Sequence, residues 1–313
     1  MDIDYRLILA PMAGVTDAAF REVCAEYGAS FTVTEMVSAK AVCFGDKKTA
    51  QLATLYDGEV GAIQIFGSEP YYMAKAAEQL LKYSPAAIDI NMGCPVPKCV
   101  KSGEGSALMK SPALCGEIVA AVRAAVNVPV TVKMRTGFDK NNINAVEVAK
   151  QVEAAGASLI CVHGRTREQL YTGKAETATT AAVKAAVSVP VIANGDIVSG
   201  ESALATLAAT GCDGIAVGRG ALGRPWLFAE ISAALSGKPY TAPTTEEKYN
   251  TLCKHLDKMT RIKGEHIAIL EARKHLAWYT KGMAGSAALR RNANSVTTLE
   301  QALAVAEEIF LKQ

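Results

Sequence analysis

Short apolar runs alternate with amphipathic or alanine-rich segments over roughly the first 235 residues. We expect strands at 7–10, 31–36, 62–66, 87–91, 130–133, 159–163, 191–194 and 214–217. The segments between them, such as 72–81, 112–126, 146–155 and 202–209, are predicted helices. Apolar, β-branched runs separated by helices indicate βαβ units and a parallel sheet.

The number of these units predicts a closed barrel. Eight strand–helix units in about 230 residues match a (β/α)8 TIM barrel, which is typically ~250 residues long. A doubly wound sheet is the alternative, but it would place a glycine-rich dinucleotide fingerprint after its first strand. Pro11-Met12-Ala13-Gly14 follows that strand instead. The predicted fold class is therefore α/β, a TIM barrel followed by helices.

The alternation stops near residue 236. Ser236-Gly237-Lys238-Pro239 and Pro243 form a polar break, and Thr245-Glu246-Glu247 is typical of a helix start. From there to residue 313 the pattern is helical, interrupted by glycines at 264, 282 and 285. We predict a catalytic barrel domain at 1–237 and a small all-helical domain at 244–313.

Charge is unevenly distributed between these parts. Residues 248–291 hold ten Lys or Arg against three acids, and also the histidines His255, His266 and His275, whereas the whole chain has a net charge of only +2. A basic segment attached to a mildly acidic body suggests a polyanion as partner. A solvated helical surface explains the same charges equally well.

Cysteine usage and the N-terminal segment indicate the compartment. The eight cysteines form no CxxC pair and have no metal-ligand spacing, so we expect free thiols, no metal site and a reducing cytosol. The first residues fit neither a signal peptide nor a transmembrane helix. We expect a soluble cytoplasmic protein with no membrane partner.

Polar residues appear at the ends of the apolar runs. In a barrel the active site lies at the C-terminal ends of the strands, which here deliver Pro11, Met12, Ala13, Gln64, Asn91, Cys94, Lys133, Arg135, His163, Arg165, Asn194, Gly195, Asp196, Gly218 and Arg219. Cys94 precedes a glycine-rich loop, and a thiol there is a candidate proton donor because its unperturbed pKa is about 8.5. A buried packing cysteine is the alternative.

Two strand-end turns suggest a phosphate site. Asn194-Gly195-Asp196 and Gly218-Arg219-Gly220 follow the seventh and eighth predicted strands, where barrels often bind phosphate. Arg219 would add a charge-assisted contact. Lys133 would then either neutralise a flavin ring or act as a Schiff-base lysine, as in barrel aldolases. The residues alone leave both possibilities open.

Six ordered motifs resemble those of the bacterial tRNA-dihydrouridine synthases, over nearly the whole chain. They are LAPMAGVTD (9–17), DINMGCP (89–95), VKMRTG (132–137), HGRTR (163–167), IANGD (192–196) and GRGALG (218–223). The resemblance implies an FMN enzyme that reduces uridine in tRNA, with NADPH as reductant. Residue 18 departs from the family pattern: Ala18 stands where a bulkier, often basic residue is expected, a difference that would alter tRNA contacts near the site mouth.

The resemblance also implies residue roles. Pro11, Met12, Ala13, Gln64, Lys133 and His163 would surround the flavin ring, and Asn194, Gly195, Asp196, Gly218 and Arg219 its ribityl phosphate. Cys94 would be the general acid that protonates C5 of uracil after hydride transfer to C6. Residues 171–175 resemble the substrate-side loop. Asn91, Arg135 and Arg165 would bind the substrate, and Arg273 and Lys274 in the helical domain would contact tRNA phosphates.

Two rival functions remain at this stage. One is another FMN barrel acting on a free small molecule, such as a dihydroorotate dehydrogenase or an ene-reductase; the basic helical domain argues against it. The other is an RNA-binding protein without redox chemistry, against which Cys94, Lys133 and His163 argue. The tRNA position, the preference for NADPH over NADH and the oligomeric state are left open, with a monomer expected.

Overall fold

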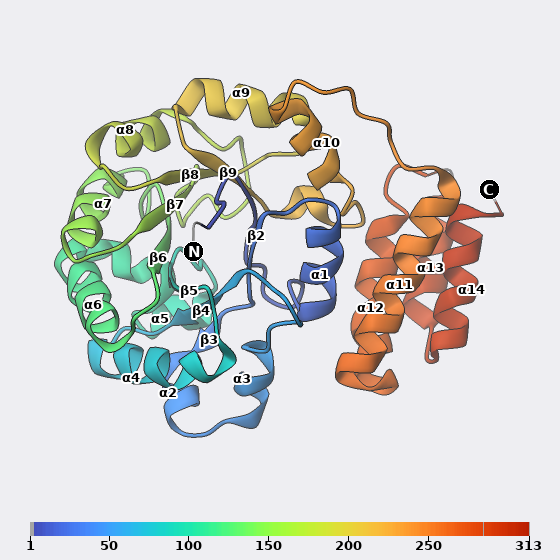
Figure 1. Ribbon diagram of the computed structural model, residues 1–313, viewed down its shortest axis with the longest axis horizontal. Helices are drawn as coiled ribbons and strands as arrows, with labels where there is room; N and C mark the ends of the chain where they lie inside the picture. The colour runs from blue at the N-terminus through green and yellow to red at the C-terminus, as the bar shows by residue number, and fades with distance from the viewer. Residues whose placement is uncertain (1–2, 284, 313) are drawn as a thin grey trace.

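One parallel sheet closes into a barrel in the computed structural model, which describes residues 3–283 and 285–312 (Figure 1). The strand order is β2-β1-β9-β8-β7-β6-β5-β4-β3, and β2 also pairs with β4, which closes the ring. The strands are β1 (Leu7–Leu9), β2 (Phe31–Val33), β3 (Val37–Ser38), β4 (Gly61–Phe66), β5 (Ala87–Met92), β6 (Val130–Arg135), β7 (Leu159–His163), β8 (Val191–Asn194) and β9 (Gly214–Val217). The predicted TIM barrel is confirmed.

The second barrel position is split, whereas the sequence predicted one strand at 31–36. Both β2 and β3 pair with β4 in parallel, so together they fill one of eight positions. Between them the Thr34 hydroxyl, rather than a backbone carbonyl, accepts the backbone N–H of Gln64 at 3.0 Å. Because a side chain takes the place of the backbone acceptor, the regular ladder of backbone hydrogen bonds is interrupted here.

Helices α1–α10 connect the strands and cover the barrel. They are α1 (Ala18–Glu26), α2 (Ala39–Cys43), α3 (Lys47–Leu52), α4 (Pro70–Leu80), α5 (Pro97–Lys101), α6 (Pro112–Ala125), α7 (Ala145–Ala154), α8 (Ala178–Ala186), α9 (Gly200–Thr210) and α10 (Leu227–Leu235). Proline begins α4 and α6, where its missing N–H costs nothing. Four helices were predicted with residue ranges. Their ends lie within two residues of the ends of α4, α6, α7 and α9.

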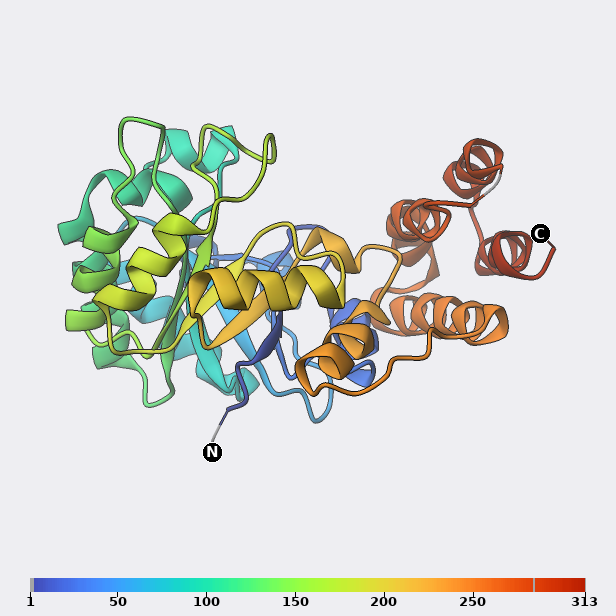
Figure 2. The same ribbon diagram turned by 90° about the horizontal axis from the view of Figure 1, so that it is seen from above.

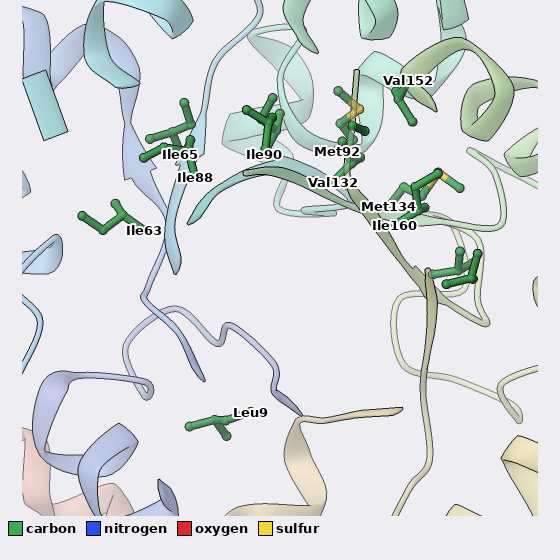
Figure 3. Packing of buried hydrophobic residues seen from close by; sticks show 14 of the residues in the cluster. Leu9, Ile63, Ile65, Ile88, Ile90, Met92, Val132, Met134, Val152 and Ile160 are labelled. Carbon is green, nitrogen blue, oxygen red and sulfur yellow. The ribbon is translucent and has the colours of Figure 1, made fainter. Parts of the chain in front are cut away.

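The main core lies between the strands and this helical layer. Figure 3 shows its side chains on neighbouring strands, including Ile63, Ile88, Val132 and Ile160, with Val152 on α7. A smaller cluster of ten buried apolar residues, among them Ile8 and Phe31, contains alternate strand positions. Because successive strand residues face opposite ways, the strands contribute to both clusters.

Four C-terminal helices pack together beside the barrel: α11 (Thr245–Lys263), α12 (Glu265–Tyr279), α13 (Ser286–Ser295) and α14 (Leu299–Phe310). Figures 1 and 2 show this bundle next to α1 and α10. It has its own apolar cluster, which also includes Ala19 of α1 and Trp226 before α10. The Thr244 side chain caps α11 in a capping box with Glu247. The domain limits proposed from the sequence remain a prediction.

Candidate active site

A cavity of about 1300 Å³ opens at the C-terminal ends of the strands. Fourteen of the site residues predicted from the sequence line it: Pro11, Met12, Ala13, Gln64, Asn91, Cys94, Lys133, Arg135, His163, Asn194, Gly195, Asp196, Gly218 and Arg219. The barrel topology brings these residues together from seven different strands or the loops that follow them. Arg165, Arg273 and Lys274 lie outside this lining.

The backbone of Cys94 is held on both sides. Asn91 Oδ1 accepts the N–H groups of Gly93 at 3.1 Å and of Cys94 at 2.8 Å. On the other side, the Ser106 hydroxyl and backbone N–H both donate to the Cys94 carbonyl, at 2.9 and 3.0 Å. The turn that carries the half-buried thiol is therefore fixed while the side chain faces the cavity.

A buried carboxylate, Asp89, fixes the amide that holds this turn. Gln64 Nε2 donates to Asp89 at 2.6 Å, and Gln64 Oε1 accepts from Asn91 Nδ2 at 2.8 Å. The Thr131 hydroxyl donates to the other Asp89 oxygen at 2.5 Å. Burial raises the pKa of Asp89, and the hydrogen bonds from Gln64 and Thr131 oppose that shift. Sequence reasoning missed this role, although a charged residue inside an apolar strand was a usable signal.

Lys133 and His163 both line the cavity, and they differ in charge. Lys133 Nζ donates to Asn194 Oδ1 at 3.0 Å. Burial lowers the pKa of Lys133. Burial, helped by the neighbouring Lys133 and Arg135 charges, lowers the pKa of His163 to about 2. The imidazole is therefore neutral at any pH near 7 and serves as a hydrogen-bonding group rather than a charge.

Arg135 and Arg165 hold the loop after β7. Arg135 donates to the carbonyls of Gly93, Thr166 and Leu170, and burial lowers its pKa to about 10. Arg165, which is 2% exposed, donates to the carbonyls of Thr172 and Gly173 and to Asp196 Oδ2. Arg165 therefore holds the loop in place. The substrate contact that the resemblance implied for it stays a prediction.

The same loop carries Tyr171, an aromatic residue at the mouth of the cavity. The Arg219 guanidinium lies 4.3 Å from the centre of the ring, and the His163 ring lies 6.4 Å from it. The phenol side chain is 53% exposed. The sequence located the loop but gave Tyr171 no individual role, because its neighbours come from distant strands.

The two glycine turns at β8 and β9 meet beside Asp196. Asp196 accepts from Arg165 and from the Ala175 N–H at 2.8 Å each, and Arg219 lies 3.5 Å away. Gly218 lines the cavity, and an added Cβ there would face Met12 Sδ at 3.7 Å. Gly218 thus lies at the cavity wall next to the Arg219 cation, where a side chain would pack against Met12.

Comparison with known proteins identifies the family of this chain. A family model described as dihydrouridine synthase matches residues 8–313. The chain belongs to the dihydrouridine synthase family. This membership confirms the family inferred from the six motifs and the prediction of an oxidoreductase, and it sets aside the aldolase, the other flavin barrels and the binding protein without redox chemistry.

Several relatives match over nearly their whole length. The tRNA-dihydrouridine synthase B of Pseudomonas aeruginosa is 43% identical over 311 residues, covering 98% of this chain and 93% of the relative. The protein of the same name from Shewanella oneidensis is 46% identical over 277 residues, covering 88% and 86%. The one from Vibrio cholerae is 43% identical over 307 residues, covering 97% and 95%.

The basic window of this family member is partly neutralised within the chain. On α11, Lys254 pairs with Glu26 at 2.6 Å, Lys258 pairs with Glu22, and Lys263 pairs with Asp17 at 2.5 Å. These three acids all lie at or on α1 of the barrel. Part of the basic charge therefore joins the bundle to the barrel, and Lys258 and Lys263 are largely withdrawn from solvent.

The two predicted phosphate contacts on α12 differ. Arg273 Nε and Nη2 both donate to the Val296 carbonyl, at 2.9 and 2.8 Å, so this guanidinium ties α12 to the end of α13. Lys274 reaches the barrel mouth, where its Nζ lies 3.6 Å from the position of a Cβ on Gly14. Ala18, the departure from the family pattern, is 7% exposed and offers almost no surface.

Across residues 3–283 and 285–312, no three His, Cys, Asp or Glu side chains cluster in a way that would hold a metal ion. Within the same residues no helix combines the length and apolarity needed to cross a membrane.

Proposed function

We propose that this chain reduces uridine in tRNA to 5,6-dihydrouridine, with FMN bound in the barrel and NADPH as the reductant. Uridine reduction is the activity that names its family. One observation supports the proposed use of FMN and NADPH. A single cavity at the strand ends is lined by Cys94, Lys133, His163 and Arg219. Ligand pockets usually occupy ~300–1,000 Å³, and this cavity is large enough for a flavin with a uracil ring.

The residues present fit FMN. Gln64, Lys133 and His163 offer hydrogen bonds and positive charge where the ring would lie, beside the apolar Pro11 and Met12. At the other end, the backbone turn at Gly218 and the Arg219 guanidinium, which both line the cavity, suit a phosphate. FMN, when bound, supplies the hydride for C6 of the uracil ring after NADPH has provided the electrons.

Asp196 has a different part in this proposal from the one that the resemblance implied. Its carboxylate already accepts from Arg165 and the Ala175 N–H, and Arg219 lies beside it. A phosphate next to an unpaired carboxylate would be repelled, whereas a paired one orients the cation. Asp196 therefore holds Arg219 near the phosphate and does not bind the phosphate itself.

Cys94 donates the proton that C5 needs. The turn is fixed by Asn91 and Ser106, so the thiol is held at the cavity wall while the uracil ring enters. A base must leave the RNA stack to reach this wall, and such extrusion costs a few kcal/mol that contacts in the pocket offset. Exposed Tyr171 at the mouth offers a face on which an extruded base stacks.

The proposal is tested on tRNA that lacks dihydrouridine, incubated with purified protein and NADPH. Cys94→Ala is expected to lower dihydrouridine formation by ~10²–10⁴-fold, the usual scale of general acid catalysis, while bleaching of the flavin by NADPH is unchanged. Cys43→Ala, which alters a half-buried thiol outside the cavity lining, is the matched control. Wild-type turnover in Cys94→Ala would remove the thiol from the mechanism.

A further inference from the structure

The cavity continues past the predicted flavin site to the junction between the barrel and the C-terminal helices. Beyond the strand ends its wall includes Arg224, Trp226, Lys248, Trp278, Tyr279 and Lys281, which we call the junction lobe. The total volume of about 1300 Å³ exceeds the ~300–1,000 Å³ of ordinary ligand pockets. FMN and a uracil ring at the strand ends leave this lobe without an assigned ligand.

Aromatic side chains form much of the lobe. The ring centres of Trp226 and Tyr279 are 6.0 Å apart, and those of Tyr279 and Phe310 are 6.2 Å apart. Trp226 is 9% exposed and Tyr279 is 3% exposed, although both face the cavity. Neither of these two rings offers a free face; Trp278, which is half-buried, provides the more accessible aromatic surface of the lobe.

Three cations surround this recess. Lys248 Nζ lies 5.7 Å from the centre of the Trp226 ring, and Lys281 follows α12 at the rim. Arg224 donates to the Val198 carbonyl and pairs with Glu230, which holds it in place. The half-buried Trp278 ring and the two lysines match a nucleotide, because an indole stacks on a base and the cations pair with phosphate.

The walls of the lobe are fixed against each other. Gly223 has a φ of +67°, and an added Cβ would lie 2.3 Å from the backbone carbonyl of Trp278. The barrel loop therefore contacts the end of α12 so closely that only glycine fits. A preformed recess binds its ligand without a cost for ordering the walls.

We propose that the junction lobe binds the adenosine-phosphate end of NADPH, an inference that rests on the proposed function. The reductant has to place its nicotinamide ring in the strand-end cavity, and its nucleotide tail then needs a contiguous site. The lobe adjoins the Gly218–Arg219 turn through the residues that follow β9 and offers the Trp278 ring and cations. A nucleotide of tRNA next to the target uridine has the same chemistry and is the competing source.

Direct binding provides the first test. Adenosine 2′,5′-bisphosphate, the tail without the nicotinamide, is titrated calorimetrically into the purified full chain. Lys248→Ala combined with Lys281→Ala is expected to raise its Kd about 10-fold or more, given the strength of charged hydrogen bonds. Trp278→Ala should raise the Kd severalfold, because it removes the accessible ring of the lobe. Lys150→Ala, on exposed α7 surface, is the charge-matched control.

A comparison of two reductants then separates binding of the nucleotide tail from hydride transfer to the flavin. The double lysine variant should show a KM for NADPH raised to a similar degree, while bleaching of the flavin by 1-benzyl-1,4-dihydronicotinamide, which lacks the tail, stays at the wild-type rate. Equal Kd values for the bisphosphate in wild type and double variant would overturn the inference. So would unchanged nucleotide binding with weakened tRNA binding, which would assign the lobe to RNA. Failure of the proposed function looks different, since neither reductant would then bleach a flavin or yield dihydrouridine.

Discussion

The strand-end site and the barrel–bundle junction bury polar groups in opposite ways. At the strand ends, Asp89, Gln64 and Asn91 satisfy one another in an unbroken series of hydrogen bonds that ends at the Cys94 backbone. At the junction, His255 and His275 pack at 4.7 Å between ring centres. Within the described chain, both nitrogens of His255 and Nδ1 of His275 lack a hydrogen-bond partner.

This difference shows what each region is built to do. A satisfied network rigidifies, which suits a thiol that must meet C5 of uracil in one geometry. The junction depends on apolar packing, aromatic contacts and a few bridging ion pairs. Of the pairs that reach the barrel, Lys263 and Asp17 form the most buried one, because Asp17 is only 8% exposed. Such a contact is expected to be the weaker part of the molecule and the more sensitive to pH and to loss of one charge.

The largest effect on stability is expected at Lys263. Its ammonium group bridges Asp17 of the barrel and Glu271 of α12, each at 2.5 Å, and Asp17 is 8% exposed. Lys263→Met leaves that carboxylate buried without its cation, which costs up to about 3 kcal/mol of unfolding free energy. Urea unfolding measures the loss.

Lys254→Met provides the matched control on the same helix. Lys254 also joins α11 to α1, through Glu26 at 2.6 Å, but the two side chains are 51% and 37% exposed. An exposed pair contributes at most about 1 kcal/mol. Equal losses in the two variants would show that burial at the junction does not decide the strength of its ion pairs.

The next largest effect is expected from a change at Asp89, in the hydrogen-bond network at the strand ends. Asp89→Asn keeps the side-chain shape but replaces one acceptor oxygen, so either Gln64 or Thr131 loses its partner. Gln64 and Asn91 then rotate more freely, and we expect dihydrouridine formation to fall ~10–100-fold, the scale of a misplacement near 1 Å. Flavin content should be retained, and alkylation of Cys94 by iodoacetamide should change in rate.

Thr131→Val separates positioning from general damage. It removes the donor on the other side of Asp89 but leaves the hydrogen bonds among Gln64, Asn91 and Cys94 in place. If both variants lose turnover equally and Cys94 alkylation is unaffected in each, the series of hydrogen bonds does not position the thiol.

The same contrast explains what the sequence reveals. Barrel strands follow a local pattern that repeats, so all eight predicted positions were found, and the topology alone brings strand ends such as Lys133 and His163 together. The Thr34 interruption was missed because its partner Gln64 lies on another strand. Asp89 was missed as a positioning residue for a similar reason.

The contacts at the junction could not be predicted from the sequence, because they join residues far apart in the chain. Lys263 and Asp17 are 246 positions apart, and no local period connects them. The sequence grouped His255 and His275 with the basic residues of a possible polyanion surface, yet the two are 0% and 1% exposed. Charge counts along a sequence do not tell which side of a helix faces solvent.

The histidines make the junction sensitive to acid. Burial lowers the pKa of His255 from 6.5 to about 4, against the pull of nearby Asp17. The folded state therefore binds fewer protons than the unfolded one, so this contribution to stability is complete above pH 6.5 and is lost as the pH falls toward 4. The loss is up to about 1.4 kcal/mol per pH unit in that window.

A matched pair of histidine variants tests this. His255→Leu, next to the ring of Phe20, should flatten the decline in unfolding free energy between pH 6.5 and 4. His266→Ala, which alters an exposed histidine on α12, should leave the decline unchanged. Urea unfolding at several pH values measures both, and parallel curves for all three proteins would exclude the buried histidine as the cause.

The smallest effect concerns the RNA contact of Lys274. Its ammonium group reaches toward Gly14 at the barrel mouth, whereas Arg273 is engaged with the Val296 carbonyl. If Lys274 contacts one phosphate, Lys274→Ala should weaken tRNA binding and reduce the slope of log affinity against log salt by ~0.7–0.9. Arg273→Ala should instead lower the unfolding free energy, because α12 loses its tie to α13, and change the slope less. Measuring tRNA affinity over a salt series for both variants tests this. If Lys274→Ala leaves the slope unchanged, this lysine is only a solvated surface charge. If Arg273→Ala changes the slope more than Lys274→Ala does, the two roles are reversed.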